Sequence, residues 1–253
     1  EIVIGHEDTS QHGIQELIKS GFKIRQIKQK SLDINQGFFK KINTTSPYIR
    51  AKIAMSKDGK TSFKNKKNKW ITSIASRNDA QHYRAISDLI VTGGGTLIND
   101  NPSLNVRSKK IIKLKGFSQP DKAVITNSQL DFETFKFFQD KSKKLIFTSK
   151  KNKVPASKKL SNTEIKSVKS EGTKIDLKDL RSRLIKLNYK DVLIEAGPGL
   201  LTSFIKANLI DEFIIYISPK MLSNTANYFI NGKSALNPIC LLYTSDAADD
   251  DAC

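Results

Sequence analysis

Apolar and polar residues alternate with a period of two where the main part of the chain begins. In Tyr48–Met55, the residues Ile49, Ala51 and Ile53 point to one side and Lys52 to the other, as in a strand with one buried face. Short apolar runs bounded by turn residues follow, and such runs are typical of buried strands. Strands are predicted at Tyr48–Met55, Leu89–Thr92, Ala123–Thr126, Lys144–Thr148, Glu164–Val168, Val192–Glu195 and Glu212–Ser218.

Segments with helical spacing separate these strands. Ser76 is predicted to begin a helix that runs through Arg84, because Asp79 three residues later completes a capping-box pattern. Strands that alternate with helices predict an α/β fold with a mostly parallel sheet flanked by helices. The other predicted segments are helices at Asp176–Leu187 and Leu200–Ala207 and a loop from Arg107 to Asp121.

The first 46 residues form a pattern of their own, a small α/β piece. Thr44-Thr45-Ser46-Pro47 interrupts it, since proline and small polar residues punctuate regular elements. We therefore place a domain boundary after residue 46. The predicted elements of this piece are strands at Ile2–Ile4 and Phe22–Ile27 and helices at Gly13–Lys19 and Ser31–Lys41.

The final segment, residues 240–253, differs in composition from the rest of the chain. The stretch from Cys240 to Asp249 looks like the in-frame translation of a common sequencing adapter, which explains an acidic, low-complexity ending in a lysine-rich protein. The alternative is a genuine disordered acidic tail. We expect a non-native tail and leave the segment out of the predicted fold.

The net charge of +18 is compatible with nucleic-acid binding. The basic residues, however, are mostly lysines scattered over predicted loops and helix faces, and no recognised nucleic-acid module accompanies them. No apolar run approaches the ~20 residues that cross a bilayer, and the N-terminus lacks a signal-peptide pattern. We expect a cytoplasmic protein that binds neither nucleic acid nor membrane. Its three histidines and two cysteines are too few and too ill-spaced for a metal site, so no metal is expected.

Two segments share one layout, a strand that runs into a glycine turn. One turn is Gly93-Gly94-Gly95, and the other is Gly197-Pro198-Gly199 followed by a helix. Glycine lets backbone amides approach a ligand, and a helix N-terminus offers unpaired N–H groups to an anion. Both turns fall at carboxyl ends of strands, where open α/β sheets bind ligands. Together they favour a phosphorylated ligand, although each alone is compatible with a simple turn.

Polar residues near these turns are candidates for the site. Asp100 and Arg107 follow the first turn closely, and arginine is suited to bidentate phosphate binding. Glu195 ends an apolar strand, where a carboxylate is either paired or faces a ligand. Trp70 is the only tryptophan and is either a stacking surface for a flat ring or a core residue.

A series of motifs then resembles a known family. The motifs are Lys52-Ile53-Ala54-Met55-Ser56-Lys57-Asp58-Gly59, Trp70-Ile71-Thr72, Arg84-Ala85, Gly95-Thr96, Asp100-Asn101-Pro102-x-Leu104-x-x-Arg107, Glu195-Ala196-Gly197-Pro198, Leu209-Ile210-Asp211-Glu212 and Tyr216-Ile217-Ser218-Pro219-Lys220. Over residues 47 to 239 they resemble the reductase half of the bifunctional riboflavin-biosynthesis deaminase–reductase. The resemblance implies a dihydrofolate-reductase-like fold, NADPH as cofactor, 5-amino-6-(5-phosphoribosylamino)uracil as substrate, and a homodimer.

The resemblance also implies roles for individual residues. Asn68 and Asn127 depart from the family, which usually has serine at the first position and often Asp-Ser around the second; both keep hydrogen-bonding capacity. For catalysis we expect Asp100 and Glu195 to orient the open-chain sugar and Lys52 or Asp100 to assist proton movement, with Lys52 included because it shares a strand face with Ala54. Substrate contacts are implied for Asn68, Arg84, Leu104, Arg107 and Glu195. Cofactor contacts are implied for Ala54, Trp70, Thr96, Asp100, Asn127, Gly197, Pro198, Gly199, Leu200, Leu201, Thr202 and Ser203.

Residues 1 to 46 resemble the closing part of the partner deaminase domain, without its zinc motifs. We therefore expect no deaminase activity from this piece, and we expect the reductase domain to be truncated at its C-terminus. Three alternatives stay open: a reductase of the same fold acting on another pterin or pyrimidine, an inactive truncated fragment, and a basic nucleic-acid-binding module.

Overall fold

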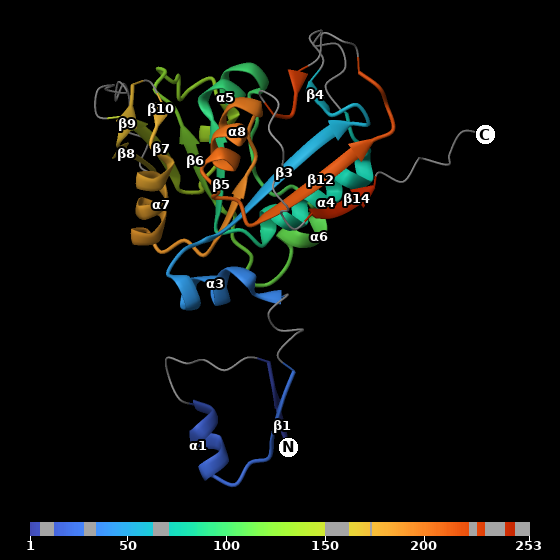
Figure 1. The fold of residues 1–253 in the computed structure, drawn as a ribbon, viewed down its shortest axis with the longest axis vertical. Helices are drawn as coiled ribbons and strands as arrows, with labels where there is room; N and C mark the ends of the chain where they lie inside the picture. Colours follow the sequence, from blue (N-terminus) through green and yellow to red (C-terminus); the bar gives the residue numbers. More distant parts are fainter. Residues whose placement is uncertain are drawn as a thin grey trace, which may run out of the picture.

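The centre of the protein is one large parallel sheet. The computed structural model describes residues 1–5, 13–27, 34–62, 71–149, 162–172, 174–222, 227–230 and 241–245. Its large sheet has eight strands in the order β14-β12-β3-β11-β5-β6-β7-β8 (Figure 1). All neighbouring pairs run parallel, which confirms the predicted mostly parallel α/β fold. The strands are β3 (Tyr48–Ser56), β5 (Leu89–Gly93), β6 (Asp121–Ile125), β7 (Lys144–Ser149), β8 (Thr163–Val168), β11 (Asp191–Ile194), β12 (Glu212–Ser218) and β14 (Leu241–Ser245).

Apolar side chains cover both faces of this sheet. On one face, Ile49 and Val91 belong to a core that also contains Leu180 of α7 (Leu177–Lys186) and Phe204 of α8 (Pro198–Lys206). The core on the other face includes Ile90 and Leu193 of the strands, with residues of α4 (Ile74–Ala85) and α5 (Gly94–Asp100). Burial on both sides explains the near-continuous apolar runs of the central strands.

Helix starts differ from the prediction in two places. The cap of α4 is Ser73, whose side chain accepts a hydrogen bond from the Ser76 amide, so the predicted start at Ser76 is wrong. A serine one turn earlier satisfies the same capping chemistry, and Asp79 instead accepts a hydrogen bond of 2.7 Å from Tyr216. Helix α8 begins at Pro198, two residues before its predicted start, because proline is favoured in a first helical turn.

Several short elements lie outside the large sheet. The segment predicted as a loop before residue 121 contains a single helical turn, α6, so that prediction is wrong for four residues. The short elements are α6 (Lys109–Ile112), the 3-10 helix η1 (Lys136–Phe138), the pair β4 (Lys60–Ser62) and β13 (Asn227–Tyr228), and the pair β9 (Ser170–Glu171) and β10 (Lys174–Ile175). None of the described helices is long and apolar enough to cross a bilayer.

The N-terminal piece contains β1 (Ile2–Ile4), α1 (Gly13–Lys19), β2 (Ile24–Gln26) and α3 (Gln36–Thr44). Three of the four predicted elements are confirmed. The fourth, the helix predicted at Ser31–Lys41, corresponds to α3, which ends three residues later than predicted, at Thr44. Helix α3 is fastened to the large sheet by side chains: Arg50 donates to Gln36 at 2.9 Å, and Lys40 forms an ion pair with Asp211 at 2.5 Å. It therefore packs on the sheet, although it precedes the predicted domain boundary.

Strand β14 lies in the segment left out of the predicted fold. Leu241–Ser245 pairs in parallel with β12, with Leu241 opposite Phe213. The exclusion is thus wrong for these five residues, because their uncharged run favours strand pairing beside an open edge. The non-native origin of residues 240–253 stays a prediction.

Candidate functional site

The two glycine turns meet at one edge of the sheet. Strands β5 and β11 are parallel neighbours, so their carboxyl ends reach the same edge, where Figure 1 shows α5 and α8. The backbone amide of Gly197, the cap of α8, donates a hydrogen bond of 3.1 Å to the hydroxyl of Thr96 in α5. This contact joins two turns into one surface, although the two bonded residues are 101 positions apart in the chain.

The glycines of the first turn have different reasons for being glycine. A Cβ on Gly94 would lie 2.3 Å from the hydroxyl oxygen of Thr126, so this position permits no side chain. A Cβ on Gly95 would meet nothing within 4 Å, and the residue is exposed. Gly94 thus allows close packing against the end of β6, while the backbone of Gly95 is open to a ligand.

A buried ion cluster lies next to these turns. Glu195, which directly follows β11, accepts two hydrogen bonds from Arg84 of α4, at 2.5 Å and 2.9 Å. The Nζ of Lys52 on β3 is 3.8 Å from the second carboxylate oxygen. The Arg84–Glu195 contact is bidentate and buried, so the orientation of both groups is well defined.

The charges of this cluster stabilise one another. Burial by itself raises the pKa of Glu195, but the positive charges of Arg84, Lys52 and Arg107 outweigh it and bring that pKa down to about 2. Burial lowers the pKa of Arg84, and the charge of Glu195 more than reverses this. Both groups are charged at neutral pH. Because both oxygens of Glu195 already accept from Arg84, the carboxylate orients that guanidinium.

The loop after α5 carries other predicted residues. Arg84 donates to the carbonyl oxygen of Asn105 at 3.0 Å, which places this loop beside the cluster. Arg107 is exposed, and its charge acts on Glu195. Leu104 is buried in the core, so its side chain packs inside and does not line an open surface. Asp100 is exposed at the C-terminal end of α5.

Several of the predicted cofactor residues lie near the glycine turns or at neighbouring strand ends. Ala54 is partly buried and lies on the face of β3 that carries Lys52, and Leu200 is partly buried beside Gly93, at 3.5 Å from a Cβ there. Asn127 bridges two strand ends, since its side-chain oxygen accepts from the amide of Ser149 at 2.9 Å. The predicted residues Asn68 and Trp70 lie outside the described residues.

Three side chains of α8 serve the helix or the core. Leu201 is buried in the core. The hydroxyls of Thr202 and Ser203 donate to the carbonyl oxygens of Pro198 and Gly199, at 2.6 Å and 3.1 Å. The parts of this helix best placed for a ligand are therefore the backbone amides of its first turn.

Sequence reasoning missed the residues that hold the loop beside the cluster. Gln81 accepts from the amide of Arg107 at 2.6 Å, and Gln119 bonds both backbone groups of Val106 at 2.8 Å. Lys122 donates to the carbonyl oxygen of Ser103. A signal existed only for Lys122, because the strand alternation gives it the inward face shared by Val124.

A hollow in the described structure lies away from the glycine turns. Its volume is about 560 Å³, it lies at the opposite edge of the sheet, between the strand starts, and its lining includes Asp88, Asp121 and Tyr189. Tyr189 donates to Asp121 at 2.6 Å, so that pair is already satisfied. Among the described residues, no group of three or more histidine, cysteine, aspartate or glutamate residues could hold a metal ion.

The sequence profile of the family described as "RibD C-terminal domain" matches residues 47–246. The chain belongs to the RibD C-terminal domain family. This confirms the expected resemblance for the reductase part, while the deaminase origin of residues 1 to 46 stays a prediction.

Individual relatives agree with the family. The chain is 36% identical over 245 residues to the riboflavin biosynthesis protein RibD of Buchnera aphidicola subsp. Baizongia pistaciae, covering 91% of this chain and 64% of the relative. It is 31% identical over 187 residues to the 5-amino-6-(5-phosphoribosylamino)uracil reductase of Buchnera aphidicola subsp. Acyrthosiphon pisum, covering 71% of this chain and 84% of that protein. The chain thus spans less than two thirds of the first relative.

A solved structure shares the fold. The structure of Acinetobacter baumannii RibD, form 1, superposes with a TM-score of 0.75 at 32% identity, over 88% of this chain and 61% of that one. The expected fold class is therefore confirmed for the reductase part. Membership in this family of reductases implies a nicotinamide cofactor.

Proposed function

We propose that the chain is the reductase of riboflavin biosynthesis that converts 5-amino-6-(5-phosphoribosylamino)uracil to its ribitylamino product with NADPH. The observation that carries the proposal is the contact between Gly197 and Thr96 beside the Arg84–Glu195 pair. It puts two glycine turns and a buried cationic group at the carboxyl edge of neighbouring strands. Ligands of open α/β sheets bind at this edge.

The residues present fit a dinucleotide cofactor. Gly95 leaves open space above its backbone, and α8 directs the free amides of its first turn to the same edge. Bound NADPH would supply the hydride. Thr96, Gly197, Pro198, Gly199 and Leu200 are the residues we propose to hold it, and Ala54, Asp100 and Asn127 remain proposed contacts from neighbouring segments.

The ion cluster is the proposed substrate side of the site. In the reaction, the ribosylamine ring opens to an imine, the imine carbon receives a hydride, and its nitrogen receives a proton. Arg107 is exposed and suited to the substrate phosphate, since guanidinium groups bind phosphate oxygens in pairs, and Arg84 adds a positive charge beside the loop that carries Arg107. Lys52 is partly buried and close to Glu195, whereas Asp100 is exposed, so we propose Lys52 as the proton donor to the nitrogen.

Glu195 and Asp100 have different proposed roles. Glu195 orients Arg84 through both carboxylate oxygens, and Lys52 lies 3.8 Å from one of them, so the proposed role of Glu195 is to position these cations. Asp100 is exposed at the end of α5, and its proposed role is to contact a hydroxyl of the open-chain sugar. Loss of turnover in Lys52→Met, with retained substrate binding, would support Lys52 as the proton donor.

The test is an assay of NADPH consumption with the ribosylamino substrate, with mass spectrometry of the product. The proposal requires oxidation that depends on this substrate and a product heavier by two hydrogen atoms. Oxidation with another pterin or pyrimidine instead would favour a related reductase of the same fold. Binding of NADPH without turnover, seen as a rise in thermal stability, would indicate an inactive fragment. The homodimer and the cytoplasmic location stay predictions.

A further inference from the structure

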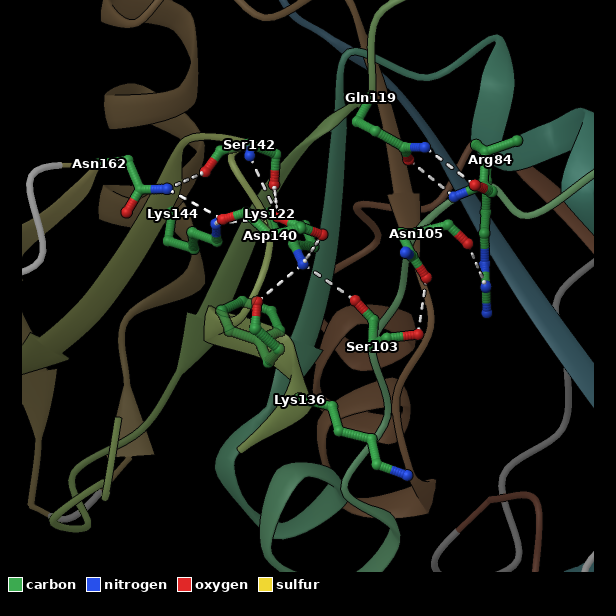
Figure 2. A network of polar contacts seen from close by, with 12 residues as sticks. Arg84, Ser103, Asn105, Gln119, Lys122, Lys136, Asp140, Ser142, Lys144 and Asn162 are labelled. Carbon is green, nitrogen blue, oxygen red and sulfur yellow. Dashed lines mark hydrogen bonds and ion pairs between the residues drawn. The ribbon is translucent and has the colours of Figure 1, made fainter. Parts of the chain in front are cut away.

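The loop Ser103–Arg107 is held by several side chains, and two of them, Gln119 and Lys122, have none of the roles proposed above. The amide of Val106 donates to Gln119 and its carbonyl accepts from the same side chain, both at 2.8 Å. The loop carbonyls at 103 and 105 accept from Lys122 at 2.9 Å and from Arg84 at 3.0 Å. Figure 2 shows Gln119 from the segment before β6, Lys122 from β6 and Arg84 from α4 directed at this loop.

The loop needs such support because its backbone is unusual. Leu104 has a φ of 51°, in the left-handed region that non-glycine residues seldom adopt, and Asn101 at the loop entrance has a φ of 43°. Such conformations persist when surrounding contacts determine them. The core packs around Leu104 itself, and Lys122 holds the preceding residue, Ser103, so the strained position is supported by packing and by a hydrogen bond next to it.

Lys122 is unusual as well. Its side chain is 1% exposed, and it lies directly opposite Lys144 in the β6–β7 pair, with a side chain that is 0% exposed. Two like charges opposite each other destabilise a sheet unless they are compensated. Asp140 provides the compensation, at 2.7 Å from Lys122 and 2.9 Å from Lys144 (Figure 2).

The two lysines differ in what else they contact. Lys122 donates to Ser103 and to the carbonyl of Phe137 at 2.7 Å, whereas Lys144 donates to Asp140 and, within the described part of the chain, to no atom of the loop. A purely structural pair of lysines would not require one of them to reach the loop. The contact with Ser103 therefore links the buried network to the segment that carries Arg107.

We propose that Lys122 and Gln119 are positioning residues that hold the Ser103–Arg107 loop so that Arg107 faces the phosphate of the substrate. This inference rests on the proposed function for its substrate. The two side chains act on backbone atoms on either side of Leu104. They fix the direction in which the loop leaves the core, while the amide of Arg107 is held by Gln81 at 2.6 Å.

The matched pair Lys122→Met and Lys144→Met tests the inference on the 253-residue chain. Both variants remove one buried lysine of the same cluster, and only the first removes a loop contact. We expect Lys122→Met to raise KM for the pyrimidine substrate about tenfold, with kcat and KM for NADPH within about twofold. Lys144→Met should leave both KM values within about twofold. Equal changes of the substrate KM in the two variants would overturn the inference.

Gln119→Met is the second variant, in case loss of a buried lysine prevents folding. It removes both bonds to Val106 without a change of charge, and we expect the same selective rise of the substrate KM. In an Arg107→Ala background, Lys122→Met and Gln119→Met should each add less than about twofold, since residues that act through one group are not additive. Full additivity would overturn the inference.

Amide hydrogen exchange separates this inference from the proposed function. Lys122→Met should speed exchange of the Val106 and Arg107 amides relative to Lys144→Met, because the loop opens locally. Unchanged exchange would show that Lys122 does not hold the loop, even if the wild-type chain is active. Absence of wild-type turnover, in contrast, would remove the proposed function and the substrate role together, while exchange would still decide whether Lys122 holds the loop.

Discussion

The amide of Gly197 is hydrogen-bonded to the hydroxyl of Thr96, at 3.1 Å. Gly197 is the N-cap of α8, Thr96 belongs to the first turn of α5, and the bond fixes the spacing between the two glycine turns. If these turns bind a dinucleotide together, the bond should matter for cofactor affinity more than for the fold.

We expect Thr96→Val to weaken NADPH binding by about 1 kcal/mol, about fivefold in Kd, because the Gly197 amide loses its partner. Titration calorimetry with NADPH measures this. Thr92→Val is the matched control, since the hydroxyl of Thr92 is buried and has no hydrogen-bond partner among the described residues. Equal affinities of the two variants would contradict a joint cofactor site.

Glu195 makes a second prediction, on the pH dependence of stability. Its folded-state pKa of about 2 is below the ordinary 4.5, so the ionised carboxylate stabilises the folded state. This contribution is complete above pH 4.5 and is lost as the pH falls toward about 2. Urea unfolding at several pH values should show this loss. Glu195→Gln should remove that component and cost about 3 kcal/mol at neutral pH, since it leaves Arg84 buried without its counter-ion.

Glu164→Gln is the control for that experiment. Lys143 and Lys166 also lower the pKa of Glu164 to about 2, but its side chain is 44% exposed. Solvent screens such a pair, so its contribution to stability should be much smaller than that of Glu195. A loss in Glu164→Gln as large as in Glu195→Gln would argue against burial as the source of the effect.

The sequence predicted the sheet well because the signal is local. The apolar runs of β5, β11 and β12 follow from burial on both faces, and no knowledge of their partners is needed to find them. The start of α4 was misplaced because Ser73 and Ser76 offer the same capping chemistry one turn apart. Only the three-dimensional placement of Asp79 near Tyr216 distinguishes them.

The site was only partly predictable, because its contacts join distant segments. Arg84 and Glu195 were both expected at the site, but their pairing spans 111 positions and no pattern in the chain announces it. The same holds for Lys122, whose partners Ser103 and Asp140 come from two different loops. Without those partners, an inward lysine reads as an exception in the strand pattern.

The first glycine turn allows a third prediction. Gly94→Ala would place its Cβ 2.3 Å from the hydroxyl oxygen of Thr126, so β5 and β6 must separate at their ends. We expect a loss of about 2 kcal/mol in the free energy of unfolding, as in other overpacked sites. Gly95→Ala has open space and a helical position, so it should be neutral or slightly stabilising. Urea midpoints of the two variants compare these effects, and equal midpoints would contradict the packing role of Gly94.

Helix α3 allows the last prediction, which bears on the domain boundary. A Cβ on Gly37 would lie 2.0 Å from a carboxylate oxygen of Asp191, and Arg50 holds that carboxylate at 2.6 Å. Asp191 cannot swing away without leaving the buried Arg50 short of a partner, so Gly37→Ala should cost about 2 kcal/mol of stability. Gly13→Ala in α1 meets nothing within 4 Å and serves as the control. If α3 belonged only to a preceding domain, both variants would unfold the large sheet at the wild-type urea concentration; a lower midpoint for Gly37→Ala alone would place α3 within the folding unit of the reductase.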